Sequence, residues 1–469
     1  MSYNSLRTLM LMAVIAIGTA SAQADDGDYV PFPGGKTFLF RVTLTDKQGT
    51  PFSISKPLEF LSEKAVQRRA RQGLPIDSTD LPISPVYLKQ ISETPKVEIV
   101  CMSKWNNTVL VKVHDMFDTI ALVEKPFVDK MECVFISPDS IKSSTRNYFR
   151  SELDQYKDGA DDYGKAAVNI DMLNGRELHK MGYRGKGITI AVFDGGFMNA
   201  DRIPALKNAH VLGAKDFVAF KTEDIFKEGD HGTRVLSTMA TDVKGAFIGT
   251  APDAEYWLFR TEDNYTEFPV EEDYWAAAAE YADSLGVDII SSSLGYQDFD
   301  DHALDHQYYE LDGNHTLISR TSSRLSSKGI IHVNSAGNDG NDAWKKVNFP
   351  ADSRDILAVG AVTRRGNNAN FSSVGPSDDG RVKPDVMALG SAAATIGGRG
   401  TINSDMGTSF ACPIMAGMVA SLWQSAPDKT ASQVMDAVRR SGDNYETPNN
   451  VYGYGIPDFI KAYNILKGQ

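Results

Sequence analysis

The sequence predicts an α/β fold, a doubly wound and mainly parallel sheet, preceded by a small α+β domain at the N-terminus. From about residue 170 onward, apolar strands alternate with helices, which is typical of such a sheet. Residues 25–150 lack this alternation, and the polar, charged residues 138–165 are typical of an exposed linker. We therefore expect four segments: 1–22, a leader; 23–137, the small domain; 138–165, the linker; and 166–469, the large domain.

Residues 1–22 have the three parts of an export signal: a positive end at Arg7, an apolar stretch over 9–18, and the small residues 20–22. The apolar stretch is shorter than the roughly 20 residues that span a bilayer. No second apolar run of spanning length is seen in the sequence. We expect an exported protein, secreted or periplasmic, without a stable membrane anchor.

The composition excludes some classes of partner and scaffold. A net charge of −13 argues against nucleic-acid binding, because neutralising phosphate needs a basic face. Three cysteines in 469 residues do not make a disulfide scaffold. Cys412 fits a core helix, whereas Cys101 and Cys133 could pair in an oxidising compartment, and the sequence leaves that pairing open.

The small domain is predicted from alternation and capping. Residues 36–43 alternate as a strand does, and 96–100 and 109–113 are further strands. Residues 62–71 form a helix with a serine cap and a basic face. The domain has no nucleophile, metal cluster or glycine-rich loop of its own, so any chemistry is expected in the large domain.

The first elements of the large domain carry an acid and a histidine. Residues 187–194 are a nearly continuous apolar run, which predicts a buried parallel strand with Asp194 at its carboxyl end, where open α/β sheets place their sites. His231 begins a helix that runs to about Ala240. Taken singly, such an Asp is commonly a turn or cap residue and such a His a surface residue.

The later elements alternate in the same way. A helix over 270–285 ends at a glycine and leads into strand 287–291; a helix over 316–328 does the same before strand 330–334. The second strand runs into Ala336, Gly337 and Asn338, and residues 356–362 form another core strand. The carboxyl ends of these strands are expected at one rim.

The turn 407–409 delivers Ser409 to the first turn of a long apolar helix over 410–423. Its oxygen would lie near free backbone amides and the positive end of a helix dipole, where an anionic intermediate is stabilised. A serine N-cap is an equally good interpretation of these residues alone. The acid and the histidine upstream favour a nucleophile.

Five ordered motifs make this chain resemble the subtilisin-like serine proteases, or subtilases. They are Asp-Gly-Gly at 194–196, His-Gly-Thr-Arg-Val at 231–235, Ser-Ser-Leu-Gly at 292–295, Ser-Ala-Gly-Asn at 335–338 and Gly-Thr-Ser-Phe-Ala at 407–411. The resemblance covers roughly residues 165–465. One departure is Gly195, where many members carry Thr or Ser, and it leaves the role of the acid intact.

The resemblance implies a serine endopeptidase acting through an acyl-enzyme. Asp194 would orient His231, His231 would take the proton of Ser409, and Asn338 would bind the oxyanion. The substrate would contact two loops whose residues are Ser292, Ser293, Leu294, Gly295, Ala336 and Gly337. No cofactor is required for this chemistry; family members often bind structural calcium, and the resemblance assigns no metal ligands here.

The resemblance also implies that the small domain is a propeptide of a self-processing zymogen, with the cleavage site within 138–165. The expected partners are protein or peptide substrates and the chain's own propeptide. A permanent accessory domain at the N-terminus is the alternative. For the large domain the alternatives are a catalytically silent, protein-binding relative and an ester-cleaving hydrolase, although the latter would want Gly-x-Ser-x-Gly and a different triad order.

One further segment is rich in metal-ligand residue types. His302 and His306 are four apart, and on a helix both imidazoles would face one side. The segment 301–315 also holds a turn and lacks a clear apolar stripe, which favours a polar surface loop.

Overall fold

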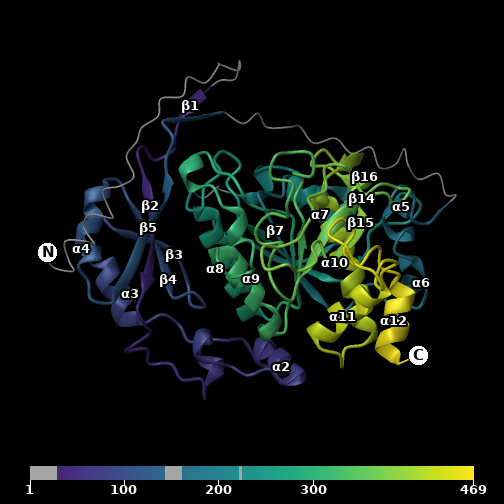
Figure 1. Ribbon diagram of the computed structural model, residues 1–469, viewed down its shortest axis with the longest axis horizontal. Coiled ribbons are helices and arrows are strands. Elements are labelled where there is room, and N and C mark those ends of the chain that lie inside the picture. Colours follow the sequence, from purple (N-terminus) through teal and green to yellow (C-terminus); the bar gives the residue numbers. More distant parts are fainter. Residues whose placement is uncertain (1–28, 143–160, 221–223, 469) are drawn as a thin grey trace.

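The computed structural model describes residues 29–142, 161–220 and 224–468, which form a small N-terminal domain beside a larger sheet-and-helix domain (Figure 1). The expected leader at 1–22 lies outside the described residues, as does most of the expected linker. None of the helices in the described ranges is long and apolar enough to cross a membrane.

The large domain is built on a seven-stranded parallel sheet, which confirms the predicted fold class. Most of its strands are buried along their whole length, because helices cover both faces. In spatial order the strands are β15 (Val386–Leu389), β14 (Leu357–Val362), β13 (Ile331–Ser335), β12 (Ile289–Ser292), β7 (Thr189–Asp194), β11 (Glu255–Arg260) and β8 (His210–Asp216).

The strand order reverses between β7 and β12. The chain fills one side of β7 with β8 and β11, then crosses β7 and adds β12 to β15 in sequence on the other side. Open α/β sheets bind their ligands at the carboxyl ends of the strands that flank such a reversal. The parallel register sets Ser292 beside Phe193, so both strands end at the same rim.

Helices pack on both faces of the sheet (Figure 1). One face carries α7 and α10 with the C-terminal helices, and the other carries α8 and α9. The helices of this domain are α5 (Ala167–Asp171), α6 (Gly175–Lys180), α7 (His231–Ala240), α8 (Val270–Leu285), α9 (Leu317–Arg324), α10 (Thr408–Ser425), α11 (Ala431–Ser441) and α12 (Phe459–Lys467). Two short antiparallel pairs complete it: β9 (Asp242–Val243) with β10 (Phe247–Ile248), and β16 (Ser391–Ile396) with β17 (Ile402–Met406).

The predicted helices agree with the structure, with one correction. Helix α8 has the predicted bounds and ends at the left-handed Gly286. The helix expected over 316–328 is capped by Thr316 and ends at Arg324, and a 3₁₀ turn over Ser326–Lys328 carries the chain to Gly329. Tightening of a last turn to i→i+3 bonding is a common way to satisfy end carbonyls.

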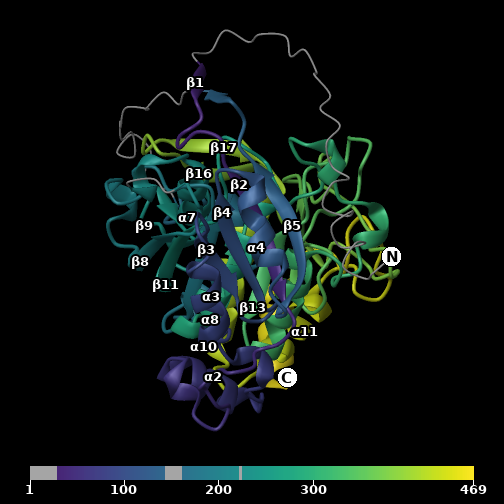
Figure 2. The same ribbon diagram turned by 90° about the vertical axis from the view of Figure 1, so that its left-hand side faces the viewer.

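The N-terminal domain has a four-stranded antiparallel sheet in the order β3-β4-β2-β5. One face packs with its own helices α3 and α4, and the other packs against α8 of the large domain (Figure 2). Its elements are β1 (Tyr29–Pro31), β2 (Phe38–Leu44), α2 (Glu63–Gln72), α3 (Pro85–Ser92), β3 (Glu98–Ser103), β4 (Thr108–Val113), α4 (Ile120–Val123), β5 (Val128–Ile136) and β6 (Ser140–Lys142).

The two cysteines whose pairing the sequence left open do not pair. Cys101 lies on β3 and Cys133 on β5, the two outer strands of the sheet, and both thiols are free. Three strand spacings separate these strands, about 14 Å, which exceeds the Cα separation that a disulfide spans.

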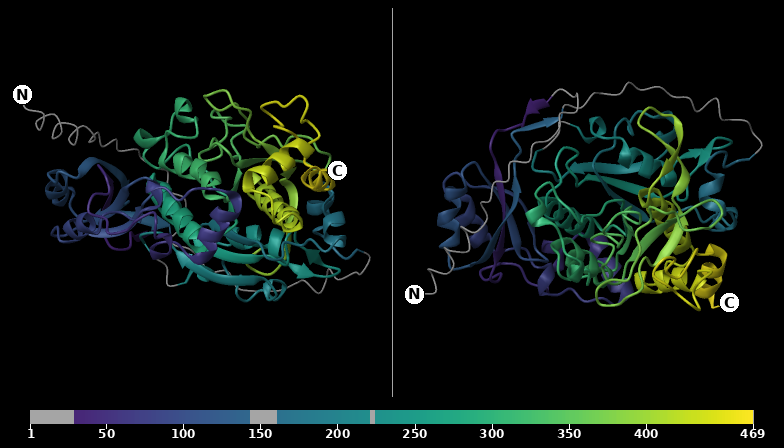
Figure 3. Two further views of the ribbon diagram at one scale, coloured as in Figure 1. Left: turned by 90° about the horizontal axis from the view of Figure 1, so that it is seen from below. Right: turned by 45° about the horizontal axis from the view of Figure 1, so that its top comes forward.

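Two parts of the N-terminal domain extend away from its sheet. Strand β6 lies within the segment expected to be linker and pairs with β1. Residues 57–80, which include α2, run beneath the large domain (Figures 1 and 3).

Candidate active site

Asp194 and His231 form a hydrogen-bonded pair at the rim of the sheet. Asp194 is the last residue of β7 and is 1% exposed, and His231 is the first residue of α7. The Nδ1 atom of His231 lies 2.9 and 3.0 Å from the two carboxylate oxygens of Asp194. A Cβ at Gly232 would come within 2.5 Å of the Gly196 carbonyl oxygen and 2.9 Å of the Asp194 Cβ, so only glycine lets helix α7 start this close to the acid.

The carboxylate determines the protonation of this histidine. Burial lowers the pKa of His231, but the charge of Asp194 and the hydrogen bond outweigh it and raise the pKa to about 9. The carboxyl of Glu262 adds to the increase. The side chain of His231 is still 43% exposed, so the ring is not fully enclosed.

Glu262 was not singled out from the sequence. It follows β11, whose last residue Arg260 pairs in register with Asp194, and so it lies at the same rim. Burial and the neighbouring Asp194 raise the pKa of Glu262 well above its ordinary value. An acid just after a strand adjacent to β7 was the signal that could have identified it.

Ser409 is the second residue of α10 and lies close to the histidine. The rings of His231 and Phe410 are 5.6 Å apart between centroids. The Ser409 hydroxyl donates to the Ser293 carbonyl oxygen at 3.3 Å, and the Ser293 hydroxyl donates to the Ser409 carbonyl oxygen at 2.8 Å. Within the described ranges no hydrogen bond joins Ser409 to His231 in this conformation.

The side chain of Asn338 is oriented by the residue before Ser409. Its Oδ1 accepts hydrogen bonds from the Thr408 backbone amide at 2.9 Å and from the Thr408 hydroxyl at 3.0 Å. A backbone amide can only donate, so this contact identifies the Asn338 atom as oxygen and leaves the NH₂ group for another acceptor. The side chain is exposed, and Gly337 before it has a φ of 110°, a conformation that favours glycine.

The predicted substrate-binding residues lie on both sides of Ser409. Ser292 ends β12, and Ser293, Leu294 and Gly295 continue from it. The Leu294 carbonyl accepts from the side chains that end β13, at 3.2 Å each, so this loop is tied to the neighbouring strand. Ala336 and Gly337 follow β13, and the Gly337 amide bonds the Thr408 hydroxyl at 3.3 Å. The structure thus brings every predicted site residue to one rim.

The histidine-rich segment 301–315 does not form a helix that would place His302 and His306 on one side, in agreement with the favoured interpretation as a loop. It contains two short 3₁₀ helices, His302–Leu304 and Tyr308–Glu310. His306 Nε2 lies 2.6 Å from Glu272, and although burial lowers the pKa of His306, that carboxylate raises it to about 9. The part of the chain that the structure describes contains no group of three or more His, Cys, Asp or Glu side chains that could hold a metal ion.

Two cavities lie away from Ser409. One of about 540 Å³ is lined by residues of β3 of the N-terminal domain and of α8, and one of about 380 Å³ lies between Phe32 and Glu228. Both are lined by residues of the two domains together. They are gaps in the domain interface and are not lined by the Asp-His-Ser constellation.

Comparison with known families identifies both domains. Residues 185–455 match the subtilase family, peptidase S8, and residues 39–149 match the peptidase S8 propeptide domain of Bacteroidota. The first match covers more than half of the chain. The chain belongs to the subtilase family, which confirms the resemblance inferred from the five motifs.

The similar proteins include proteases from animals and bacteria. The chain is 31% identical over 301 residues to the membrane-bound transcription factor site-1 protease of Rattus norvegicus, covering 62% of this chain and 26% of that protein. It is 29% identical over 291 residues to subtilisin NAT of Bacillus subtilis subsp. natto, covering 61% and 68%. It thus spans about a quarter of the length of the site-1 proteases that it matches. A crystal structure of MycP1 from the ESX-1 type VII secretion system matches with a TM-score of 0.52 and 21% identity, covering 69% of this chain and 91% of that one, and supports the fold.

Proposed function

We propose that this chain is an exported serine endopeptidase that cleaves peptide bonds through an acyl-enzyme. The observation that carries the proposal is the Asp194–His231 hydrogen bond at the rim where Ser409 begins α10. A serine hydroxyl is a weak nucleophile at neutral pH, so a neighbouring base is required. The family membership supports the same chemistry.

In the proposed first step, the neutral His231 takes the Ser409 proton on Nε2 while Oγ attacks the substrate carbonyl carbon. Asp194 accepts a hydrogen bond from the Nδ1–H group and stabilises the imidazolium that forms. The Ser409 hydroxyl must turn from the Ser293 carbonyl toward the ring. Catalytic hydrogen bonds are often long or misaligned until substrate binds, so this rotation is compatible with the mechanism.

The tetrahedral oxyanion would be bound by the Asn338 NH₂ group and the backbone amide of Ser409. Both donors are fixed before the reaction, since Thr408 holds the Asn338 oxygen and Ser409 lies in the first turn of α10. His231 then gives its proton to the leaving amine, and water hydrolyses the acyl-enzyme by the same route. The mechanism uses no metal or cofactor.

We propose that the substrate lies extended along Ser292, Ser293, Leu294 and Gly295, with Ala336 and Gly337 opposite. Small side chains on both sides leave room for a sizeable apolar residue before the scissile bond. Edge-to-edge strand pairing supplies main-chain hydrogen bonds, which do not depend on the side chains of the substrate. Protein and peptide substrates fit this arrangement.

We further propose that the enzyme is made as a self-processing zymogen. Its segments would be a signal peptide at 1–22, a propeptide domain at 23–137, a linker with the processing site at 138–165 and the catalytic domain at 166–469. The two matched family regions, 39–149 and 185–455, are arranged in the order that this proposal requires.

The decisive experiment is the intact mass of purified protein that begins at Gln23, with Ser409→Ala as the comparison. Shortening of the wild type by roughly residues 23–165, with a full-length variant, supports both the serine and the processing. Equal cleavage of both proteins means that another protease acts. If both stay whole, self-processing is wrong, and hydrolysis of an unfolded protein by wild type but not by Ser409→Ala then tests the peptidase activity alone.

A further inference from the structure

Residues 57–80 form an arm that reaches from the N-terminal domain to the far edge of the catalytic sheet. The arm leaves after β2 and returns before α3, and it contains α2 between two 3₁₀ turns, Pro57–Glu59 and Ser78–Asp80. Helix α2 lies beneath the large domain, away from the sheet of its own domain (Figures 1 and 2). It contacts the chain where β7, β12 and β13 begin, whereas the proposed active site lies where these strands end.

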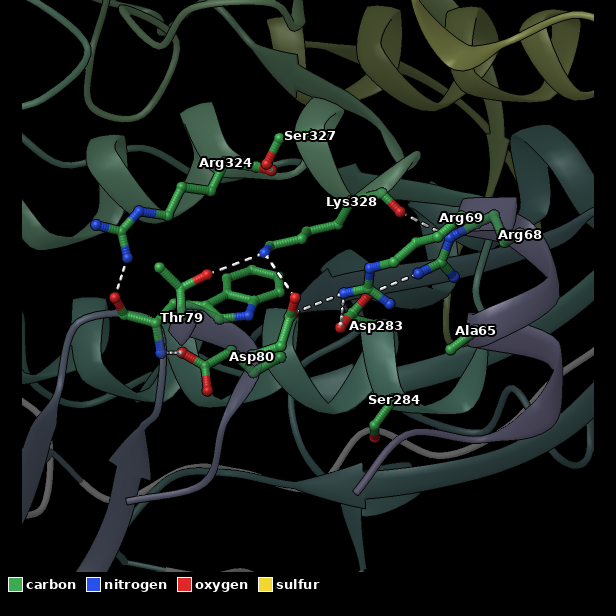
Figure 4. Close-up of polar contacts among 12 residues, drawn as sticks. Ala65, Arg68, Arg69, Thr79, Asp80, Asp283, Ser284, Arg324, Ser327 and Lys328 are labelled. Carbon is green, nitrogen blue, oxygen red and sulfur yellow. Dashed lines mark hydrogen bonds and ion pairs between the residues drawn. The ribbon is translucent and has the colours of Figure 1, made fainter. Parts of the chain in front are cut away.

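The arm carries part of a buried group of charges, which we call the charge cluster: Arg68, Arg69 and Asp80 of the arm with Asp283 and Lys328 of the catalytic domain (Figure 4). Each of the five side chains is at most 1% exposed. Charged side chains are almost never buried this completely unless they are paired.

Three of the four ion pairs in the charge cluster cross between the two domains. One carboxylate oxygen of Asp283 accepts a hydrogen bond from Arg68 Nη2 at 2.5 Å, and the other accepts one from Arg69 Nη2 at 2.9 Å. Asp80 of the arm receives Arg69 at 2.8 Å and Lys328 at 3.1 Å. Three cations and two anions therefore alternate across the contact, and neither domain alone supplies all the partners.

Arg68 also donates through the other two nitrogens of its guanidinium. Its Nε donates to the Lys328 carbonyl oxygen at 3.0 Å and its Nη1 to the Val287 carbonyl oxygen at 2.7 Å. The planar guanidinium thus donates hydrogen bonds to a carboxylate and to two carbonyl oxygens at once, which a lysine could not do in this geometry. The acceptors at this edge of the catalytic domain therefore match the geometry of an arginine side chain.

Uncharged contacts extend the arm interface on either side. The Gln72 side chain donates to the Gly329 carbonyl at 2.8 Å and accepts from the Ala431 amide at 2.9 Å. At the other end of α2, Lys64 Nζ donates to the Thr189 hydroxyl at 2.5 Å. The arm therefore bridges three strands and the start of α11.

A separate set of contacts joins the N-terminal sheet to α8. Arg41 pairs with Asp273, with its Nη2 2.6 Å from Oδ2, and Glu280 accepts from the Trp105 backbone amide at 2.9 Å. Asp273 and Asp283 are ten residues apart on α8, which is about 15 Å along a helix. The sheet and the arm are thus two attachments at different places.

We propose that the arm keeps the N-terminal domain attached after the linker is cut, so that the processed protein is a two-chain complex. The proposal builds on the self-processing proposed above. Two attachments on one rigid partner act together, because the one that stays bound holds the other at high effective concentration. The arm contributes at an edge that substrate does not reach, so substrate in the cleft does not displace it.

The test separates retention from self-processing. A recognition sequence for an added, site-specific protease is placed between residues 143 and 160 in the Ser409→Ala protein, which cannot process itself in the proposed mechanism. The cut protein is then followed by size exclusion across a dilution series. We expect the two fragments to elute together. Immediate separation of fragments carrying the intact arm would overturn the proposal, whether or not the wild type processes itself.

Matched variants assign the retention to the charge cluster. Arg68→Ala leaves Asp283 with one of its two cations, and loss of one partner of a buried pair predicts a Kd about 10²–10⁴-fold higher. Arg71→Ala is the control, because it removes the same charge from an exposed position on the same helix. Gln72→Ala removes two hydrogen bonds from a half-buried side chain and serves if Arg68→Ala does not fold. Equal retention by the variant that folds and by Arg71→Ala refutes a role for the arm.

Discussion

The sharpest prediction concerns Thr408, which precedes the proposed nucleophile and holds the proposed oxyanion donor. Thr408→Val keeps the shape of the side chain and removes its hydroxyl. Asn338 then loses the 3.0 Å hydrogen bond from that hydroxyl and keeps the 2.9 Å bond from the backbone amide. The NH₂ group that would face the oxyanion stays present and becomes less firmly oriented.

The size of the effect follows from the bonds that remain. One neutral hydrogen bond contributes about 0.5–1.5 kcal/mol, which corresponds to roughly a 2- to 12-fold loss of kcat. Asn338→Ala removes the donor itself, for which we expect a loss of about 10²–10³-fold, a figure measured in subtilisin, a relative of this chain. Thr408→Val should therefore fall well short of Asn338→Ala.

The assay is steady-state hydrolysis of a chromogenic peptide by the processed enzyme, with kcat and KM determined separately. Thr408→Ser is the control, because it restores the hydroxyl, and it should recover most of the lost kcat with little change in KM. Urea unfolding checks that the variants remain folded, since the hydroxyl also bonds Gly337. A loss equal to that of Asn338→Ala, or no recovery with Thr408→Ser, would show that Thr408 does not act by orienting the amide.

Three other predictions follow from individual side chains. Since the base must be neutral and the pKa of His231 is raised to about 9, kcat/KM should rise as the pH passes through 9. Glu262→Gln removes a carboxylate that raises this pKa, so the rise should move to lower pH. A rise near pH 6.5 in the unaltered enzyme contradicts the raised pKa of His231. Burial lowers the pKa of His179 from 6.5 to about 4, so its contribution to stability, up to about 3 kcal/mol, is present above pH 6.5 and lost as pH falls to about 4. Urea unfolding of His179→Gln should show a weaker dependence on pH in that window, and an unchanged dependence excludes His179 as the cause. In Gly417→Ala the new Cβ would lie 2.0 Å from the Thr250 hydroxyl oxygen. This overpacking should lower the free energy of unfolding by about 1–3 kcal/mol. An unchanged midpoint of urea unfolding would show that the Thr250 side chain moves away without cost.

The rim of the catalytic sheet was predictable because each of its residues is marked by a local pattern. Asp194 ends an apolar run, His231 begins a helix and Asn338 follows a strand, and the structure places them at those positions. In a parallel sheet the carboxyl ends of all strands lie at one edge, so the order of elements is enough to bring such residues together. The bounds of α8 were also predictable from neighbouring residues, because Gly286 ends the helix.

The contacts between the domains were not predictable in this way. The sequence indicated a capped helix at 62–71 with a basic face, and α2 confirms the helix and its Ser62 cap. A basic face normally predicts exposure to solvent, yet Arg68 and Arg69 are buried. Their partner Asp283 is more than 200 residues away in the chain, and no periodicity links positions that far apart.

The sequence by itself determined the fold class, the order of strands and helices, and the positions of the proposed catalytic residues, because hydrophobic periodicity and turn residues act over a few neighbours. Tertiary structure alone decided which polar groups meet. It oriented Asn338 through Thr408, raised the pKa of His231 through Asp194, and buried the arginines of the arm against Asp283. These effects depend on distances between polar atoms and on the local dielectric. Both are set by chain segments that only the fold brings together.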